Sequence, residues 1–451
     1  MNVREINRVY FIGIGGIGMS ALARFFREQG AVVKGYDRTR TELTAQLEAE
    51  GMGVHYTDDV ELLDKETELV IYTPAIPNDH TELNWYRDNG YGVYKRSDVL
   101  QWITEAMHAI TVAGTHGKTT ISTMIAYLLR ETGYGCNAFL GGVSVNYNSN
   151  YWSGRTDIAV VEADEYDRSF LKLFPDVAVL TAMDADHLDI YGTVKDMEEA
   201  FIQYTRNIKP GGTLVAKHGL SRGADLQGEH KMTYSLQNDS ADVYATDIVQ
   251  KHGEYIFNVA GKDWTIENLH LPIGGMHNVE NAVAAIAVTK ILEVDGEKVK
   301  AALSEFKGIR RRFEYVLKNE AVVYIDDYAH HPEELAALIK SAKQLFAGRR
   351  CVVVFQPHLF TRTRDLAEGF AHSLDMADEA ILLDIYPARE LPLEGVTSQM
   401  IAGKMQNGAT ILSREGLLEY VKVAPISLFI TAGAGDIDKL VEPIKEILKK
   451  R

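Results

Sequence analysis

The sequence predicts an α/β protein of three α/β domains, and two glycine-rich loops and a repeated alternation of strands and helices support this prediction. Short apolar runs recur along the chain, separated by segments of helical character, as in parallel sheets whose strands are connected by helices. A chain of 451 residues is also too long for one ordinary core. The expected domains are an N-terminal Rossmann-like domain at 1–107, a central P-loop ATPase-type sheet at 108–313 and a C-terminal Rossmann-like domain at 314–451.

Composition and charge argue against several classes of protein. The net charge is −16 and the pI is near 5.4, which does not favour general binding to nucleic acid or to membrane surfaces. We expect small-molecule partners and a monomer or homodimer. Cys136 and Cys351 are far apart and lack a C-x-x-C spacing, so neither a disulfide framework nor a cysteine zinc site is indicated. No apolar stretch approaches about 18 residues and the N-terminus is no signal peptide, so we expect a cytoplasmic location.

The first section opens with a strand, a glycine-rich loop and a helix. A strand at 9–12 is followed by Gly-Ile-Gly-Gly-Ile-Gly at 13–18, a helix, and a second strand that ends on Asp37. The glycines fit G-x-G-x-x-G, and Asp37 stands about where a ribose-binding acid would lie. The motif alone suggests an NAD enzyme. However, any nucleotide diphosphate can rest on a helix N-terminus in this way.

The second section carries Gly-Thr-His-Gly-Lys-Thr at 114–119, the most informative stretch of the chain. It follows an apolar run at 109–113 and precedes a helical segment at 120–129, which is the context of a phosphate loop. Its glycines turn N–H groups toward phosphate oxygens, its lysine reaches the β/γ-phosphates, and its threonine can ligate Mg²⁺. The standard pattern needs glycine at position 112, where Val112 stands, so the loop is a shortened variant. A turn that only caps a helix is the plainer alternative.

Acidic residues follow the next two strands of this section. A strand at 158–161 ends in Glu162-Ala-Asp-Glu165, and a strand at 177–180 leads to Asp184-Ala-Asp-His-Leu-Asp189. Ligands bind at the carboxyl ends of strands in open α/β sheets, and Mg²⁺ needs only one or two carboxylates because it keeps several waters. We therefore expect a magnesium site near the phosphate loop; solvated loop acids are the alternative.

Three polar residues, His277, Asn278 and Asn281, stand at the start of an apolar helix near 283–292. They would cluster around the first turn of that helix. Contact with the nucleotide is one interpretation, and N-capping by Asn278 is the other.

The third section begins near the basic run at 310–312, and its strands also end in polar residues. Adjacent His330 and His331 suggest zinc, but no H-E-x-x-H spacing supports it. Arg362 and Arg364 are better suited to clamp a carboxylate or a phosphate, because the guanidinium fork pairs bidentately with such anions. The expected strands lie at 322–325, 352–355, 379–383 and 426–431.

Seven motifs stand in chain order along the sequence. They are Gly-Ile-Gly-Gly-Ile-Gly-Met-Ser at 13–20, the loop at 114–119, Glu162-Ala-Asp-Glu165, Asp186-His187-Leu-Asp189, His277-Asn278 with Asn281, Asp326-Asp327-Tyr-Ala-His-His-Pro, and Phe355-Gln-Pro-His358. Together they resemble the Mur ligases over essentially the whole chain. The run at 355–364 is similar to that of members that add L-alanine to UDP-N-acetylmuramate. Members that recycle murein tripeptide are the nearest alternative.

The resemblance implies a role for each section. The first section would bind the UDP-sugar through Gly13, Gly15, Gly16, Gly18, Met19, Ser20 and Asp37. The second and third would bind ATP through Gly114, Thr115, His116, Gly117, Lys118, Thr119, Thr120, His277, Asn278, Asn281, Arg312 and Asp327. Catalysis would fall to Lys118, Glu162 and His187, with one or two Mg²⁺ ions on Thr119, Glu162 and His187. Tyr328, His358 and Arg362 would line the amino-acid pocket.

The implied reaction is an ATP-dependent ligation. The lactyl carboxylate would attack the γ-phosphorus to give an acyl phosphate, and the L-alanine amine would then displace phosphate. A nucleotide-cofactor oxidoreductase, or a nucleotide-binding regulator that uses the loop at 13–18, is the alternative from another class. The Lys-Thr pair at 118–119 argues against it, because a dehydrogenase has no need of a triphosphate cradle.

Overall fold

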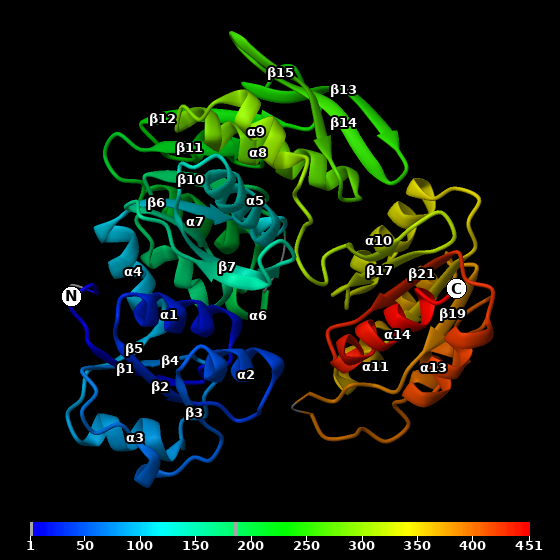
Figure 1. Ribbon diagram of the computed structural model, residues 1–451, viewed down its shortest axis with the longest axis horizontal. Coiled ribbons are helices and arrows are strands. Elements are labelled where there is room, and N and C mark those ends of the chain that lie inside the picture. Colours follow the sequence, from blue (N-terminus) through cyan, green and yellow to red (C-terminus); the bar gives the residue numbers. More distant parts are fainter. Residues whose placement is uncertain (1–2, 185–187, 389) are drawn as a thin grey trace. The chain divides into compact units, whose positions relative to one another are not determined.

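The computed structural model describes residues 3–184, 188–388 and 390–451, and its strands form three sheets (Figure 1). Parallel strands joined by helices dominate each sheet, so the predicted fold class is confirmed. By internal contacts the chain divides into two compact units. The first comprises 1–247, 257–269 and 280–305, and the second comprises 248–256, 270–279 and 306–451. Within the described ranges, no helix combines the length and the apolar character needed to cross a bilayer.

The first sheet presents the glycine-rich loop at its carboxyl edge. Its elements are β1 (Arg8–Ile12), α1 (Ile17–Glu28), β2 (Val32–Tyr36), α2 (Glu42–Ala49), β3 (Gly53–His55), η1 (Val60–Leu62), β4 (Leu69–Tyr72), α3 (Thr81–Asp88), β5 (Val93–Lys95) and α4 (Arg96–Ala106). The strand order is β3-β2-β1-β4-β5, all parallel. The order reverses between β1 and β4, which is where such sheets open a ligand crevice.

The second sheet places the phosphate loop between two acidic segments. Its elements are β6 (His108–Ala113), α5 (Lys118–Glu131), β7 (Asn137–Ser144), β8 (Ser149–Trp152), β9 (Ile158–Glu162), η2 (Tyr166–Lys172), β10 (Val177–Leu180), α6 (Leu188–Tyr191), α7 (Val194–Thr205), β11 (Thr213–Lys217), η3 (Gly223–Asp225), β12 (His230–Ser235), β13 (Val243–Lys251), β14 (Glu254–Gly261), β15 (Trp264–Leu271), α8 (Met276–Ile291) and α9 (Gly296–Leu303). The order is β15-β14-β13-β12-β11-β10-β6-β9-β7-β8. Because β6 pairs in parallel with both β10 and β9, the segments that follow these strands flank the loop after β6.

The third sheet is almost wholly parallel. Its elements are β16 (Glu314–Lys318), β17 (Val323–Asp327), α10 (Pro332–Leu345), β18 (Cys351–Phe355), α11 (Phe360–Leu374), β19 (Glu379–Leu382), α12 (Ser398–Ala402), β20 (Thr410–Ile411), α13 (Arg414–Val423), β21 (Leu428–Ala432), η4 (Asp436–Leu440) and α14 (Val441–Leu448). The order is β16-β17-β21-β18-β19-β20, and only β16 runs antiparallel to its neighbour. All of β18 is buried, including Cys351, which is therefore a core residue.

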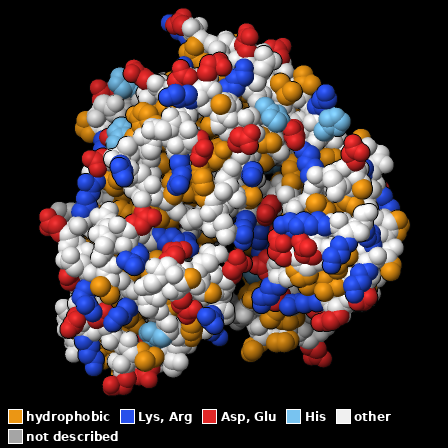
Figure 2. Space-filling model, viewed as in Figure 1, with side chains coloured by type: hydrophobic (Ala, Val, Ile, Leu, Met, Phe, Trp, Pro, Cys, Tyr) orange, Lys and Arg blue, Asp and Glu red, His pale blue; other side chains and the backbone are white. Residues whose placement is uncertain are grey.

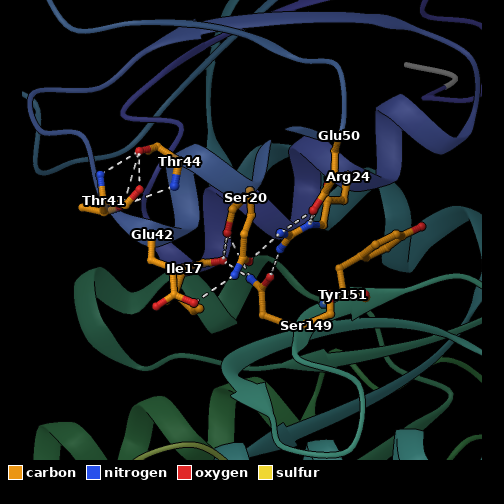
Figure 3. A network of polar contacts seen from close by, with 11 residues as sticks. Ile17, Ser20, Arg24, Thr41, Glu42, Thr44, Glu50, Ser149 and Tyr151 are labelled. Atoms are coloured by element: carbon orange, nitrogen blue, oxygen red, sulfur yellow. Dashed lines mark hydrogen bonds and ion pairs between the residues drawn. The ribbon is translucent and has the colours of Figure 1, made fainter. Parts of the chain in front are cut away.

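Helix α1 is shared between the first sheet and the β7–β8 hairpin of the second. The ring of Phe25 lies against the rings of Phe139 and Tyr151. Arg24 is directed toward Glu50 at the end of α2 (Figure 3) and donates to its carboxylate at 2.8 Å. Arg24 also donates to Asn150 of β8. The helix that carries the glycine-rich loop is thereby fixed on the sheet that carries the phosphate loop.

Charges of opposite sign are mixed on the surface. Figure 2 shows Lys and Arg side chains interspersed with Asp and Glu over the face that it draws. The sequence carries 63 acidic against 47 basic residues. A basic pocket for an anionic ligand must therefore be local, built by a few cations that the fold brings together.

Candidate active site

The loop at 114–117 has the backbone of a phosphate loop. Gly114 and Gly117 take φ angles of +126° and +79°, which side chains with a Cβ rarely adopt. Gly117 is the N-cap of α5 and has no side chain with which to cap the helix. Backbone N–H groups at the start of a helix suit an anion.

The lysine and the threonine of the loop are each held by one carboxylate of the segment at 162–165, at the end of β9. Lys118 Nζ donates to Glu165 Oε1 at 2.8 Å and to Gly114 O at 2.7 Å. Thr119 Oγ1 donates to Glu162 Oε1 at 3.0 Å. The side chain of Glu165 is 1% exposed and that of Lys118 is 14% exposed. The segment at 162–165 therefore positions the lysine and the threonine of the loop together.

The other members of the loop also have fixed partners. Thr115 Oγ1 accepts a hydrogen bond from Asp184 N at 3.3 Å, and the Thr181 hydroxyl donates to the carbonyl of His116. The imidazole of His116 is exposed beside Asp184, at 3.6 Å. Thr120 continues the first turn of α5. The loop is thus held from the β10 side as well as from the β9 side.

Of the three polar residues at the start of α8, the structure places Asn281 against the phosphate loop. A Cβ on Gly117 would lie 2.9 Å from Asn281 Oδ1. Asn278 Nδ2 donates to Gly274 O at 2.6 Å. Asn278 therefore stands inside the first turn of α8, which begins at Met276, and not at the N-cap, the position of the plainer alternative. His277 lies over Gly275. His277 and Asn278 belong to the second unit, whereas Asn281 belongs to the first.

The second acidic segment is only partly described. His187 and Asp186, predicted at the metal site, lie outside the described residues, and the side chain of Asp189 is not described either. Within the described part of the chain, no group of three or more His, Cys, Asp or Glu residues stands ready to hold a metal ion. Thr119 and Glu162 still present two oxygens 3.0 Å apart at the phosphate loop. Mg²⁺ needs few protein ligands, so this pair fits one.

The glycine-rich loop after β1 is braced by Asp37. Gly15 N donates to Asp37 Oδ2 at 2.7 Å, and Thr39 N donates to Oδ1 at 3.2 Å. A Cβ on Gly15 would lie 2.8 Å from Asp37 Oδ2 and 2.5 Å from Thr44 Cγ2. The carboxylate of Asp37 thus holds the backbone of the loop, and its contact with the ribose stays a prediction.

The loop continues into α1 with its next side chains turned inward. Gly13 N and Ile14 N donate to Tyr36 O, and Gly16, at the N-cap, donates to Gly13 O. Met19 and Ser20 are buried, and Ser20 Oγ donates to Ile17 O at 2.9 Å (Figure 3). Ser20 N also has a partner, Gly16 O, at 2.8 Å.

In the second unit, Asp327 is occupied by backbone donors. Its Oδ2 accepts from Phe313 N and its Oδ1 from Ala329 N, both at 2.7 Å. The carboxylate thus closes the turn that holds Arg312, whose guanidinium lies 5.6 Å from the ring centre of Tyr328. Burial raises the pKa of Asp327. Its expected contact with the ATP ribose would have to compete with these bonds.

A row of rings runs across the carboxyl edge of the third sheet. Successive ring centres are 5.3 Å apart from Tyr328 to His330, 6.3 Å from His330 to His358 and 5.9 Å from His358 to Tyr386. Burial lowers the pKa of His330, and the nearby Arg362 and Arg312 lower it further. Arg362 donates no hydrogen bond to any residue that the structure describes. The structure therefore brings Tyr328, His358 and Arg362 to one region.

A cavity of about 390 Å³ adjoins this row of rings. It lies after the carboxyl ends of β18, β19 and β21, and Tyr386 stands in its wall. The cavity also meets Gln356, whose Nε2 donates to Asp436 Oδ1 at 3.0 Å. Tyr386, Gln356 and Asp436 received no role from the sequence.

Two features that the sequence singled out in this region have local partners in the structure. Arg364, which was predicted with Arg362 as an anion clamp, is exposed and donates to its neighbour Asp365 at 2.7 Å. His331 forms a capping box with Glu334 at the start of α10. The adjacent histidines thus lie at the start of a helix.

Comparisons with known proteins assign the chain to a family. Family models match at 8–108 (Mur ligase family, catalytic domain), 112–289 (Mur ligase middle domain) and 311–435 (Mur ligase, glutamate ligase domain). The UDP-N-acetylmuramate–L-alanine ligase of Cytophaga hutchinsonii is 46% identical over 461 residues, which covers 100% of this chain and 99% of that protein. The chain belongs to the Mur ligase family. A second such ligase, from Porphyromonas gingivalis, is 47% identical over 98% of this chain and 99% of that protein.

Solved structures of family members share the fold. The UDP-N-acetylmuramate–alanine ligase of Thermotoga maritima superposes with a TM-score of 0.84 at 28% identity, over 98% of this chain and 99% of that one. A murein peptide ligase of Psychrobacter arcticus superposes with a TM-score of 0.69 at 23% identity, over 99% of both chains. The resemblance to the Mur ligases that the motifs suggested is confirmed.

Two further residues to which sequence reasoning gave no role contact the glycine-containing loops of this Mur ligase. Glu165 belongs to a motif that was noticed, but its contact with Lys118 spans 47 positions and is visible only in the fold. Arg96 belongs to none of the noticed motifs. It stands at the start of α4 and lies beside Gly18 of the glycine-rich loop.

Proposed function

We propose that this Mur ligase joins L-alanine to the lactyl carboxylate of UDP-N-acetylmuramate and converts ATP to ADP and phosphate. The observation that carries the proposal is the identity of 46–47% with UDP-N-acetylmuramate–L-alanine ligases along nearly the entire chain. Such identity spans all the segments described above. It includes the region after β18, where the sequence resembles members that take L-alanine.

The phosphate loop would carry out the first step. A lactyl carboxylate oxygen attacks the γ-phosphorus, the bond to the bridging oxygen of ADP breaks, and an acyl phosphate forms. Two anions must approach each other, so catalysis depends on cations and on N–H donors. Lys118 and the open N-terminus of α5 supply both, and Glu165 holds the lysine before ATP arrives.

Magnesium would complete this site. When bound, it would neutralise charge on the triphosphate. Thr119 and Glu162 are the described residues suited to hold it, and His187 is proposed as a third ligand from the resemblance alone. We propose one or two ions.

The ring row and Arg362 would carry out the second step. The L-alanine carboxylate would pair with the Arg362 fork, and Tyr328 and His358 would border its side chain. The amine then attacks the acyl carbonyl, the bond to phosphate breaks, and the ammonium loses a proton to give the amide. We further propose that the protein is cytoplasmic, as its nucleotide substrates are.

Phosphate release tests the function. The full chain should release phosphate with ATP, Mg²⁺ and UDP-N-acetylmuramate when L-alanine is added, and far less with other amino acids. Preference for the tripeptide L-alanyl-γ-D-glutamyl-meso-diaminopimelate would instead assign the chain to the murein-recycling members. A change in NADH fluorescence on adding the protein, without phosphate release, would favour the oxidoreductase alternative.

A further inference from the structure

Arg96 lies in the ligand crevice of the first sheet. It directly follows β5, and the glycine-rich loop directly follows β1. All strands of this sheet are parallel, so both segments stand at the same edge. Because the strand order reverses between β1 and β4, Arg96 and the loop occupy opposite sides of the crevice where doubly wound sheets bind their ligands.

The missing side chain of Gly18 makes room for this arginine. A Cβ built on Gly18 would come within 3.0 Å of Arg96 Cδ and 3.2 Å of Cζ, and closer still to Nη1. The third glycine of the motif therefore seats a guanidinium over the first turn of α1. That turn has neither a side-chain cap nor an acidic residue.

The guanidinium is largely buried and has few partners. Its side chain is 24% exposed, and its ion pair is with Asp164, at 3.5 Å. It donates no hydrogen bond to any described residue, although the fork carries five N–H groups. Such a group at a helix N-terminus is suited to receive oxygens of an anion.

We propose that Arg96 binds an oxyanion of the UDP-sugar, either the diphosphate or the lactyl carboxylate. This inference rests on the proposed function and adds a binding residue to it. Asp164 lies between Glu162 and Glu165, the carboxylates that hold Thr119 and Lys118. The same short segment therefore touches the arginine of the sugar crevice and both functional residues of the phosphate loop.

Calorimetric binding to the full chain tests the proposal without turnover. UDP, UDP-N-acetylglucosamine and UDP-N-acetylmuramate are titrated into the wild type, Arg96→Met, Arg96→Lys and a control, Arg206→Ala, whose side chain is 57% exposed. Losing charge-assisted hydrogen bonds should weaken binding about 10- to 100-fold in Arg96→Met. Arg96→Lys should recover part of the loss, and the control should match the wild type.

The three ligands distinguish the two oxyanions. Equal weakening for all three identifies the diphosphate, whereas weakening for UDP-N-acetylmuramate alone identifies the lactyl carboxylate. Unchanged binding of all three to Arg96→Met with a normal unfolding temperature would overturn the proposal. A wild type that binds none of them would instead overturn the proposed function.

Gly18→Ala provides a second variant that leaves α4 intact. Its methyl group should displace the guanidinium and weaken the same ligands. In the Arg96→Met background the same change should cost less than about twofold, because the effects of two residues in contact are not additive. If the losses of affinity in the two single variants added up in the double variant, Gly18 would not be the residue that positions the Arg96 guanidinium.

Discussion

Lys118 is held by two acceptors of its own chain. Its ammonium contacts the buried Glu165 carboxylate and the Gly114 carbonyl, so groups of the protein fix its position. Preorganised charge costs no reorganisation during reaction, which is why such groups contribute strongly to phosphoryl transfer. The Thr119–Glu162 contact places the second functional residue of the loop in the same way.

Lys118→Ala should lower turnover by about 10²-fold or more while the fold is retained, because charge stabilisation in the transition state is lost. Phosphate release at saturating ATP measures this. Lys195→Ala, an exposed change on α7, is the matched control and should leave turnover unchanged. Near-normal turnover of Lys118→Ala would mean that this loop does not serve the transferred phosphate.

Arg362→Ala should raise the KM for L-alanine with little change in the KM values for ATP and the UDP-sugar. The loss should be about 2–5 kcal/mol for one partner of a desolvated charge pair, and Arg362→Lys should restore only part of it because a point charge cannot pair bidentately. Arg364→Ala, already paired with Asp365 on the same helix, is the control. If the KM for ATP rose and the KM for L-alanine stayed unchanged, Arg362 would bind the nucleotide and not the amino acid.

At the scale of elements, β1, β3 and α3 meet at a buried cluster away from the glycine-rich loop. The Tyr10 hydroxyl lies 2.8 Å from Glu82 Oε2 and 2.6 Å from His55 Nε2. Tyr10 donates its hydroxyl hydrogen bond to Glu82 Oε2, and Asp59 N donates to Glu82 Oε1 at 3.1 Å. His55 Nδ1 lies 2.9 Å from the carbonyl of Thr57.

The pKa of Glu82 follows from this arrangement. Its side chain is 0% exposed, and burial is the main reason that its pKa rises from 4.5 to about 7. The folded protein thus binds more protons here than the unfolded chain between these values, so unfolding free energy falls as pH rises through the window. Burial lowers the pKa of His55, so the unfolded chain binds more protons at this residue than the folded protein. The contribution of His55 to the unfolding free energy is therefore lost as pH falls.

Glu82→Gln should therefore remove the contribution of Glu82 to the pH dependence of the unfolding free energy and leave the contribution of His55 unchanged. The wild type should lose up to about 3 kcal/mol relative to the variant between pH 5 and pH 8, since one pKa unit corresponds to about 1.4 kcal/mol. Urea unfolding of both proteins at several pH values measures the difference. The exposed Glu61→Gln is the control. A constant difference across this range would show that Glu82 is ionised throughout.

Local patterns predicted the two loops and not their long-range partners. Gly117 and Lys118 were recognisable because a strand, a glycine turn and a helix adjoin in sequence. The contact of Glu165 with Lys118 depends on strand order, which no local pattern fixes. The strands β13 to β15 were missed because their exposed faces are largely polar, and β16 because it is short and only partly buried. For Asp37 and Asp327 the sequence predicted contacts with ligands, and it did not predict the bonds to backbone amides that the structure shows.

At the scale of the whole molecule, Arg24 joins the first sheet to the second within one compact unit. Its side chain is 7% exposed, and it donates to Glu50 and to the fully buried Asn150. Asn150 in turn donates to Ser20 Oγ at 3.1 Å. Hydrogen bonds between the two sheets therefore fix the position of the glycine-rich loop relative to the phosphate loop.

Arg24→Met should test that relation, since it keeps the apolar stem but removes the donors. The Asn150 carbonyl would lose its partner, which should cost about 1–3 kcal/mol of unfolding free energy, whereas the half-exposed Glu50 can turn to water. Turnover should also fall, because the two loops would no longer be held in fixed positions relative to each other, while the KM for L-alanine should stay unchanged.

Arg27→Met, an exposed change three residues further along α1, is the matched control. Stability loss without a change in turnover would mean that the link serves folding alone. Normal stability and turnover would mean instead that packing of Phe25 against Phe139 and Tyr151 already fixes the helix.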